Sequence, residues 1–329
     1  MSGKYTIGID LGGTNIKAGV LDEQGELVYR CSNETQADRG FEHAFSRLVL
    51  TVDQCIAESK LTKRDILAIG YGTPGPMSHK KGIIYASPNL PGWVNIPMRA
   101  KFSEAVGLPV TLENDANVAA YGEFIAGAGK GTQDMVMLTL GTGIGGGVVL
   151  NGRMQRGAFD NAGEIGHVIA VPNGRACPCG QLGCLERYGS ANSVAERLAE
   201  ALQAGNLPAA EAESVLKDRV AAGESITSAD VAKAAREGDA LASRIWDETC
   251  MHIGIACVNV QHMLNPELIV IGGGLIRAGA QLLDPIRTHF EKQSWRIAKD
   301  QPQIEFATRG DDAGVIGAAA LARDEFGGE

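Results

Sequence analysis

The sequence predicts an α/β protein that contains a duplicated unit, with a cleft between its two halves. Short β-rich runs alternate with longer segments of helical periodicity, which is the pattern of an α/β fold. Two strand-turn-strand segments with glycine-rich turns, at residues 5–21 and 135–150, open two similar series of elements. A length of 329 residues agrees with two domains of ordinary size.

The first half begins with three predicted strands that are joined by turns containing glycine. Apolar and β-branched runs mark its strands, and apolar residues at helical spacing mark its helices. The predicted strands are residues 5–10, 16–21, 27–30, 66–71 and 110–113, and the predicted helices are residues 41–58 and 115–126.

The second half repeats this organisation and ends in a helix of small apolar residues, which predicts close packing of that helix on other elements. Its predicted strands are residues 135–140, 146–150 and 267–271, and its predicted helices are residues 190–204, 228–236, 240–264 and 313–323. The expected domains are residues 1–118 together with 313–329, and residues 119–312.

The overall charge and hydropathy exclude several classes of protein. A net charge of −9 without a Lys/Arg run argues against nucleic-acid binding, which depends on phosphate neutralisation. No apolar stretch is long enough for a signal peptide or a membrane span. We therefore expect a cytoplasmic protein with neither nucleic acid nor membrane as a partner.

A glycine-rich turn between the first two strands has the composition of a phosphate-binding loop. Its glycines let the backbone approach an oxyanion, and Thr14 offers a hydroxyl donor. Asp10 can hold Mg²⁺, and Lys17 adds positive charge near the phosphates. A tight hairpin turn without a ligand is the alternative. The candidate residues are Asp10, Gly12, Gly13, Thr14, Asn15 and Lys17.

Two further glycine clusters suit the same nucleotide. Gly141, Thr142 and Gly143 lie in a matching strand-turn-strand context, which makes coincidence a poor explanation of the pair of loops. Gly272, Gly273 and Gly274 follow an apolar strand and offer a surface suited to adenosine. Neither strand-turn-strand loop has the P-loop spacing, and the first lacks the context of a Rossmann fingerprint.

Asp115 lies where a predicted strand ends and a helix begins, within the segment 113–117. Transfer of a phosphoryl group to a hydroxyl requires a base within hydrogen-bonding reach, and such a junction can hold one rigidly. Helix N-capping by Asn114 or Asp115 is the competing interpretation. The phosphate loops favour the catalytic one.

One histidine and three cysteines form the pattern His-x9-Cys-x-Cys-x4-Cys, which suits a closed tetrahedral Zn²⁺ site of a structural kind. The candidate ligands are His167, Cys177, Cys179 and Cys184. The other cysteines are expected to be buried packing residues, since a disulfide framework is atypical of the cytosol; they are Cys31, Cys55, Cys250 and Cys257.

Two glutamates flank the cysteine cluster, Glu164 before His167 and Glu186 after Cys184. Zinc would orient the His167 ring and leave its second nitrogen for a ligand. The glutamates would then accept hydrogen bonds from neighbouring hydroxyls. Solvated charge is the alternative for either glutamate taken alone.

Together these motifs resemble the ROK family (repressor, open reading frame, kinase) of the actin-like, hexokinase-like ATPase superfamily. The resemblance covers nearly the whole chain, and the cysteine signature with its upstream Gly-His is highly specific. The matching segments are residues 10–17, 72–76, 113–117, 140–147, 163–167, 177–186 and 271–274.

The resemblance implies an actin-like (ribonuclease H-like) fold that binds ATP and a sugar in its interdomain cleft. It implies Asp115 as general base for phosphorylation of a hexose, most simply at O6. Family members are commonly homodimers, and some are homotetramers. The implied sugar contacts are Asn114, Asp115, Glu164, His167 and Glu186, with Gly75 and Asn89 in segments that line the site in relatives.

The identity of the hexose rests on two details. Residues 87–93 and the Gly75-Pro76 pair resemble the glucokinases of this family. Glucose is therefore the expected substrate, while N-acetylglucosamine or N-acetylmannosamine, and fructose, mannose or allose, stay open, as does polyphosphate in place of ATP.

The family also contains sugar-responsive repressors, which carry a helix-turn-helix segment before the first loop. Nine residues precede Asp10 here, too few for that segment, so we expect a kinase. An actin-like filament protein would share the loops but would need neither the zinc cluster nor Glu186.

Overall fold

The structure is a computed structural model that describes residues 4–87, 89–295, 297 and 299–328. Its contacts divide the chain into two compact units, residues 1–133, 147–163 and 308–329, and residues 134–146 and 164–307. These limits differ from the predicted boundaries at 118 and 313. Residue 118 lies inside helix α3 (Asp115–Ala126), which stays whole in the first unit because it packs along helix α11 (Ala313–Phe326).

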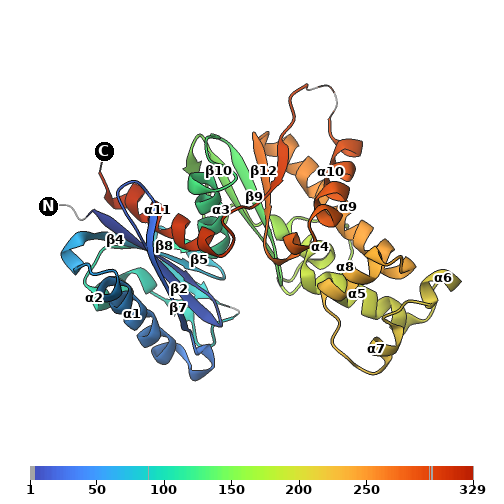
Figure 1. The fold of residues 1–329 in the computed structure, drawn as a ribbon, viewed down its shortest axis with the longest axis horizontal. Helices are drawn as coiled ribbons and strands as arrows, with labels where there is room; N and C mark the ends of the chain where they lie inside the picture. The colour runs from blue at the N-terminus through green and yellow to red at the C-terminus, as the bar shows by residue number, and fades with distance from the viewer. Residues whose placement is uncertain (1–3, 88, 296, 298, 329) are drawn as a thin grey trace. The chain divides into compact units, whose positions relative to one another are not determined.

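The first unit is built on a five-stranded sheet of order β3-β2-β1-β4-β8, and it also has a small sheet of order β5-β6-β7 (Figure 1). The small sheet was not predicted, because strands of two to four residues are too short to show an alternating pattern. The strands are β1 (Tyr5–Leu11), β2 (Asn15–Leu21), β3 (Leu27–Glu34), β4 (Ile66–Thr73), β5 (Met77–Ser78), β6 (Ile83–Ala86), β7 (Val94–Ile96) and β8 (Val110–Asn114), and the remaining helices are α1 (Phe41–Glu58) and α2 (Met98–Val106).

Helix α11 lies against one face of this sheet, and glycines in the strands allow its close approach. A Cβ at Gly8 of β1 would lie 1.8 Å from the carbonyl oxygen of Val315, and one at Gly70 of β4 would lie 1.7 Å from that of Ala318. Ile7 and Ile9 alternate with Gly8 along β1 and belong to the core cluster that includes residues of α1 and α2. The prediction of a closely packed last helix is therefore confirmed.

The second unit contains most of another five-stranded sheet, of order β11-β10-β9-β12-β13. Strand β10 continues past the limit of this unit, at residue 146. The strands are β9 (Met135–Leu140), β10 (Ile144–Leu150), β11 (Arg153–Met154), β12 (Leu268–Gly272) and β13 (Gln303–Phe306). The helices are α4 (Glu186–Gly189), α5 (Ala191–Ala204), α6 (Ala209–Ala212), α7 (Lys217–Ala221), α8 (Ser228–Arg236), α9 (Ala240–Leu264) and α10 (Ala280–Gln293).

The two sheets repeat one topology. In each, three consecutive strands occupy one side in reverse order, and two later parallel strands continue the sheet on the other side. The predicted duplication is thus confirmed. Cys55, Cys250 and Cys257 are buried as expected, whereas Cys31 on the edge strand β3 is only half-buried.

In the part of the chain that the structure describes, no helix combines the length and the apolar character that crossing a membrane requires.

Candidate active site

Three parallel strands of the first unit end at one edge of its sheet. Strand β1 pairs with β4 so that Asp10 lies opposite Gly72, and β4 pairs with β8 so that Thr73 lies opposite Asn114. The carboxyl ends of parallel strands form the ligand-binding edge of open α/β sheets. The structure therefore brings the predicted Mg²⁺ carboxylate Asp10 and the predicted base Asp115 to the same edge.

Asn114 is the N-cap of α3, and Asp115 is the first residue of the helix. The Asn114 side-chain oxygen accepts hydrogen bonds from the backbone N–H groups of Ala116 at 2.9 Å and Asn117 at 3.2 Å. Asp115 Oδ1 also accepts from Ala116 N, at 2.8 Å. The capping role therefore belongs to Asn114, and the Asp115 carboxylate lies at a helix N-terminus, where the helix dipole favours negative charge.

A buried acidic residue supports this junction from below. Glu113 is 2 % exposed, and its Oε1 accepts from Asn114 N at 3.0 Å and from Asn117 Nδ2 at 2.9 Å. Its Oε2 pairs with Arg156 Nε at 2.5 Å. Glu113 thus ties the end of β8 to the first turn of α3, and Arg156 neutralises the charge that this buried carboxylate carries.

The first glycine loop is a compact turn in which several backbone groups are paired. Gly12 N donates to Asn15 O at 2.9 Å, and Thr35 N donates to Thr14 O at 2.8 Å. The Thr35 hydroxyl donates to Gly12 O at 2.7 Å. Thr35, just after β3, was not predicted to be part of the site, and it holds this loop in shape.

Two predicted sugar residues lie in other loops of the first unit. Gly75 follows β4 with a φ of 94°, which favours glycine. Asn89 covers Gly13, because a Cβ at Gly13 would lie 2.8 Å from the Asn89 carbonyl oxygen. Pro88, which belongs to the segment resembling glucokinases, lies outside the described residues.

Asp10 and Lys17 are cross-strand neighbours on β1 and β2. Burial raises the pKa of Asp10, Lys17 opposes that shift, and Asp311 adds to it. Lys17 Nζ pairs with Asp311 Oδ1 at 2.8 Å. A divalent cation would relieve the desolvated Asp10 carboxylate, so this side chain fits the Mg²⁺ role that the sequence predicts.

The second glycine loop links β9 to β10 in the second unit and is held at both ends. Gly141 N donates to Gly143 O at 2.9 Å, and Ala191 N, at the start of α5, donates to Gly141 O at 2.9 Å. Thr142, at the tip of the loop, is exposed. The loop thus offers an exposed hydroxyl on a turn of constrained shape, as a phosphate cradle requires.

The third glycine cluster lies beside this loop. Strand β12 pairs in parallel with β9 so that Gly272 lies opposite Thr139. Gly273 has a φ of 85°, and a Cβ there would lie 2.5 Å from the carbonyl oxygen of Leu140. Around a Cβ at Gly274, by contrast, the described residues leave open space. Gly273 therefore serves close packing on β9, while Gly274 is free for the approach of a ligand.

The four predicted zinc ligands converge in the second unit. Their ligand atoms all lie within 4.8 Å of one another. Cys179 Sγ is 3.6 Å from Cys184 Sγ, and Cys177 Sγ is 3.8 Å from His167 Nδ1. Ligands at Zn–S distances of about 2.3 Å in a tetrahedron are separated by about 3.8 Å. The arrangement fits a closed tetrahedral site.

The three thiols differ in their protonation without a metal. Burial raises the pKa of Cys184 to about 12 and also raises the pKa of Cys177. The backbone N–H of Gln181 lowers the pKa of Cys179. Three thiolates this close together need a cation to be stable, which again fits zinc.

The carboxylates beside this cluster occupy different environments. Glu164 is exposed and precedes the 3₁₀ turn Ile165–His167. Glu186 is half-buried and opens helix α4, and its Oε2 accepts a hydrogen bond from Ile144 N at 2.9 Å. Because His167 turns Nδ1 toward Cys177, Nε2 is the nitrogen that this orientation leaves for a ligand.

Comparison with known proteins identifies the family to which the chain belongs. Residues 6–325 match the profile of the ROK family. The chain belongs to the ROK family. It is 38% identical to a glucokinase of Halalkalibacterium halodurans over 326 residues, which cover 99% of this chain and 97% of that protein.

Two solved ROK structures are similar over their full length. The ROK hexokinase from Thermus thermophilus gives a TM-score of 0.82 at 32% identity and covers 98% of both chains. A ROK family glucokinase from Streptomyces griseus, solved in complex with glucose and AMPPNP, gives 0.75 at 34% identity, covering 97% of this chain and 99% of that one. The predicted actin-like ATPase fold of the ROK family is thereby confirmed.

Two supporting residues of this ROK protein were not found from the sequence. Glu113 was placed in the motif without a role, and Arg156 was not singled out. Residues 113 and 156 are far apart in the chain, and neither lies in a pattern that reports a contact between them. A charged residue two positions before a catalytic candidate was the available signal.

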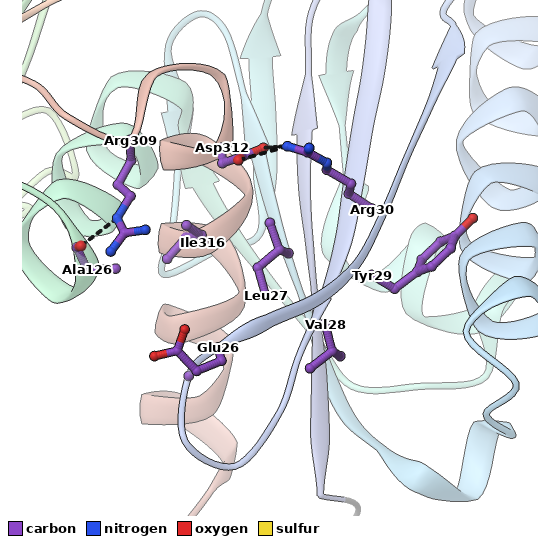
Figure 2. A pocket seen from close by; sticks show the side chains of 10 residues that line it. Glu26, Leu27, Val28, Tyr29, Arg30, Ala126, Arg309, Asp312 and Ile316 are labelled. Carbon is purple, nitrogen blue, oxygen red and sulfur yellow. Dashed lines mark hydrogen bonds and ion pairs between the residues drawn. The ribbon is translucent and has the colours of Figure 1, made fainter.

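A hollow of about 540 Å³ on the first unit lies apart from these residues (Figure 2). Arg30 pairs there with Asp312 at 3.1 Å, and Arg309 Nε donates to the carbonyl oxygen of Ala126 at 2.5 Å. Its lining, as far as the described residues show it, includes no predicted site residue. Both polar contacts join the turn before α11 to β3 and α3, and Ile316 of α11 also lines the hollow, which therefore lies along the packing of α11.

Proposed function

We propose that this chain is an ATP-dependent glucokinase, which transfers the γ-phosphoryl group of ATP to O6 of glucose. The observation that carries the proposal is the Asp115 carboxylate at the start of α3, where Asn114 has taken over capping. The glucokinase relative at 38% identity and the similar structure that holds glucose and AMPPNP support it.

In the proposed reaction, Asp115 accepts the proton of the glucose O6 hydroxyl as O6 attacks the γ-phosphorus. The new O6–P bond forms while the bond from the γ-phosphorus to the bridging β,γ-oxygen breaks, so that ADP leaves. Asp115 then holds the proton until it is released. Glu113 and Arg156 keep the end of β8 and the first turn of α3 in the geometry that this transfer needs.

The remaining site residues bind and orient the substrates. Mg²⁺, when bound through Asp10, would supply positive charge to the phosphates. We propose glucose contacts for Gly75, Asn89, Asn114, Glu164, His167 and Glu186, and ATP contacts for Gly12, Gly13, Thr14, Asn15, Lys17, Gly141, Thr142, Gly143, Gly272, Gly273 and Gly274. The backbone N–H groups of the glycine loops would stabilise negative charge on the phosphates.

We propose structural Zn²⁺ at His167, Cys177, Cys179 and Cys184, where it would hold the loop that orients His167 and Glu186. Cys179→Ser should lose both the metal, measured by elemental analysis, and glucose affinity, measured by calorimetry. Full glucose affinity in the zinc-free variant would contradict this link. Cys31→Ser, on strand β3, is the matched control.

We further propose that the protein acts in the cytoplasm as a homodimer or homotetramer without a nucleic-acid partner. The charge of −9 and the resemblance to oligomeric family members support this.

The kinase proposal is tested by ADP release from Mg·ATP with glucose, mannose, fructose, allose, N-acetylglucosamine and N-acetylmannosamine. We expect the highest kcat/KM with glucose and a loss of about 10²–10⁴-fold in kcat for Asp115→Asn. Asp22→Asn, in an exposed turn where the amide oxygen can still accept the hydrogen bonds of the turn, is the matched control.

Preference for an N-acetylated sugar would keep the mechanism and change the substrate. Full turnover of a folded Asp115→Asn protein would remove Asp115 from the role of base.

A further inference from the structure

Glu186, the proposed sugar ligand, is in direct contact with the second phosphate loop. Its Oε2 accepts a hydrogen bond from Ile144 N at 2.9 Å, and Ile144 directly follows the loop. A Cβ built on Gly143 would lie only 2.2 Å from the same Oε2 and 3.1 Å from Glu186 Cδ. The space beside residue 143 is therefore filled by the Glu186 carboxylate.

The segment that carries Glu186 also holds the other end of this loop. Ala191 N, five residues after Glu186, donates to Gly141 O at 2.9 Å. The loop is closed on itself by the bond from Gly141 N to Gly143 O at 2.9 Å. A displacement of Glu186 must therefore shift the loop, and a displacement of the loop must shift Glu186.

A carboxylate has two oxygens and can accept several hydrogen bonds at once. Oε2 of Glu186 accepts the hydrogen bond from Ile144 N, so Oε1 is the oxygen that would accept a hydrogen bond from a further donor. A sugar hydroxyl that donates to this carboxylate shares its negative charge with the Ile144 N–H group, so each hydrogen bond affects the strength of the other.

We propose that Glu186 couples the two substrates: one oxygen fixes the second phosphate loop through Ile144 N–H, and the other accepts a sugar hydroxyl. This inference rests on the proposed function, since it needs a sugar at Glu186 and a nucleotide at the loop. Because coupling between two ligands is reciprocal, a change on either side must alter the affinity for the other ligand.

Gly143→Ala tests the coupling from the side of the nucleotide loop. The φ of Gly143 is outside the left-handed region, and the nearest obstacle to a methyl group is the end of a flexible side chain, so the variant should fold with Glu186 displaced. Gly141→Ala is the matched control in the same loop, because a Cβ there meets open space among the described residues.

The measurement is calorimetric titration of D-glucose into the whole chain, purified with zinc in the buffer and without nucleotide. We expect a dissociation constant about tenfold or more above that of wild type for Gly143→Ala, as for a misplaced charge-assisted hydrogen bond. For Gly141→Ala we expect a change of less than about twofold.

Glu186→Ala tests the coupling from the sugar side and does not depend on how Gly143→Ala folds. Without the carboxylate, Ile144 N loses its acceptor, so AMPPNP should bind more weakly even when no sugar is present. Glu164→Ala removes another proposed sugar ligand, one that is exposed, and should leave sugar-free AMPPNP binding unchanged.

Wild-type glucose affinity in Gly143→Ala, or equal losses in Gly143→Ala and Gly141→Ala, would overturn the coupling while leaving a glucose-phosphorylating wild type intact as a kinase. Unchanged AMPPNP affinity in Glu186→Ala would overturn it as well. Failure of the proposed function looks different, because the wild-type protein would then neither bind nor phosphorylate glucose, and the coupling would fall with it.

Discussion

At the scale of single residues, the role of each carboxylate depends on which neighbouring groups are already satisfied. Asn114 and Asp115 are adjacent and both suit a helix N-cap, but the N–H groups of Ala116 and Asn117 bond to Asn114. Glu113, the third polar residue in this run, is committed to Arg156 and to the backbone. Asp115 follows these two residues in the chain, and its Oδ1 accepts a hydrogen bond from Ala116 N, which orients the carboxylate at the helix N-terminus.

Asp10 trades stability for its proposed function. Burial raises the pKa of Asp10 above its ordinary value of 3.8, so the folded state binds a proton more readily than the unfolded state does. The free energy of unfolding therefore falls as the pH rises from 3.8 through the pKa of Asp10 in the folded protein. We expect Asp10→Asn, which cannot ionise, to raise Tm of the ligand-free protein at pH 7 and to lower kcat. Thermal denaturation at a series of pH values checks this, with Asp22→Asn as the control.

The gain in Tm should shrink as the pH is lowered, because wild-type Asp10 then binds a proton in the folded state and no longer carries a buried charge. A variant without any gain at pH 7 would contradict the stated cause of the shift.

The ion pair between Glu113 and Arg156 should be worth far more than the surface pair between Arg30 and Asp312. Arg156→Met removes the nearer of the two basic groups beside the 2 % exposed Glu113 carboxylate and leaves His79 Nδ1 at 3.9 Å, which should lower the free energy of unfolding by about 3 kcal/mol. Arg30→Met, at a side chain that is 71% exposed, should lower the free energy of unfolding by less than about 1 kcal/mol. Urea denaturation of both variants measures the difference, and equal losses would contradict the larger contribution of the buried pair.

At the scale of elements, helix α11 packs closely on the sheet because glycines stand at the strand positions nearest to it. Gly8 and Gly70 lie on β1 and β4 where the helix backbone approaches. Helix α11 itself also has small residues at its contacts. A Cβ at Gly317 of α11 would lie 1.8 Å from the carbonyl oxygen of Val118 in α3. Strand β1 carries Asp10 and helix α3 begins at Asp115, so the packing of α11 against both elements sets the positions of these two carboxylates.

Gly70→Ala should therefore destabilise the protein severely. Its methyl group would overlap the carbonyl of Ala318, which belongs to helix backbone and cannot rotate away, so we expect a loss of at least about 3 kcal/mol. Gly107→Ala, at the end of α2 with a φ of 68° and open space around it, should lose only about 1 kcal/mol. Denaturant midpoints compare the two, and a mild effect of Gly70→Ala would mean that α11 can shift on the sheet.

At the scale of the whole molecule, the chain leaves the first unit and returns to it twice, and one buried glutamate secures the second return. Glu123 of α3 is fully buried. It accepts hydrogen bonds from the backbone N–H groups of Ala128 at 2.9 Å, Thr308 at 3.0 Å and Arg309 at 2.6 Å. Residue 308 is where the chain comes back from the second unit.

Glu123→Gln should loosen this return. The amide replaces one acceptor oxygen by a donor that faces backbone N–H groups, and a loss of about 2–3 kcal/mol in the free energy of unfolding is expected. Limited proteolysis should then cut near residues 307–310 faster than in wild type. Glu26→Gln, on the exposed end of the β2–β3 turn, is the control and should change stability by less than about 0.5 kcal/mol. Unaltered proteolysis in Glu123→Gln would show that other contacts secure the segment.

The sequence by itself determined the local features of this protein. Periodicity and turn chemistry predicted β1, β2, α3 and the long helix α9, because these depend on residues close together in the chain. The cysteine spacing predicted the ligand cluster, and the two glycine loops predicted a duplicated α/β unit, which the structure shows as two sheets of the same topology.

Only the tertiary structure decided which distant residues meet. The pairing of Glu113 with Arg156, the contact of Glu186 with Ile144 and the anchoring of Thr308 by Glu123 join residues 43, 42 and 185 positions apart. The unit boundaries also depended on the packing of α3 against α11 rather than on composition. Such contacts form when chain topology brings elements together, and the short-range preferences that a sequence displays do not specify their partners.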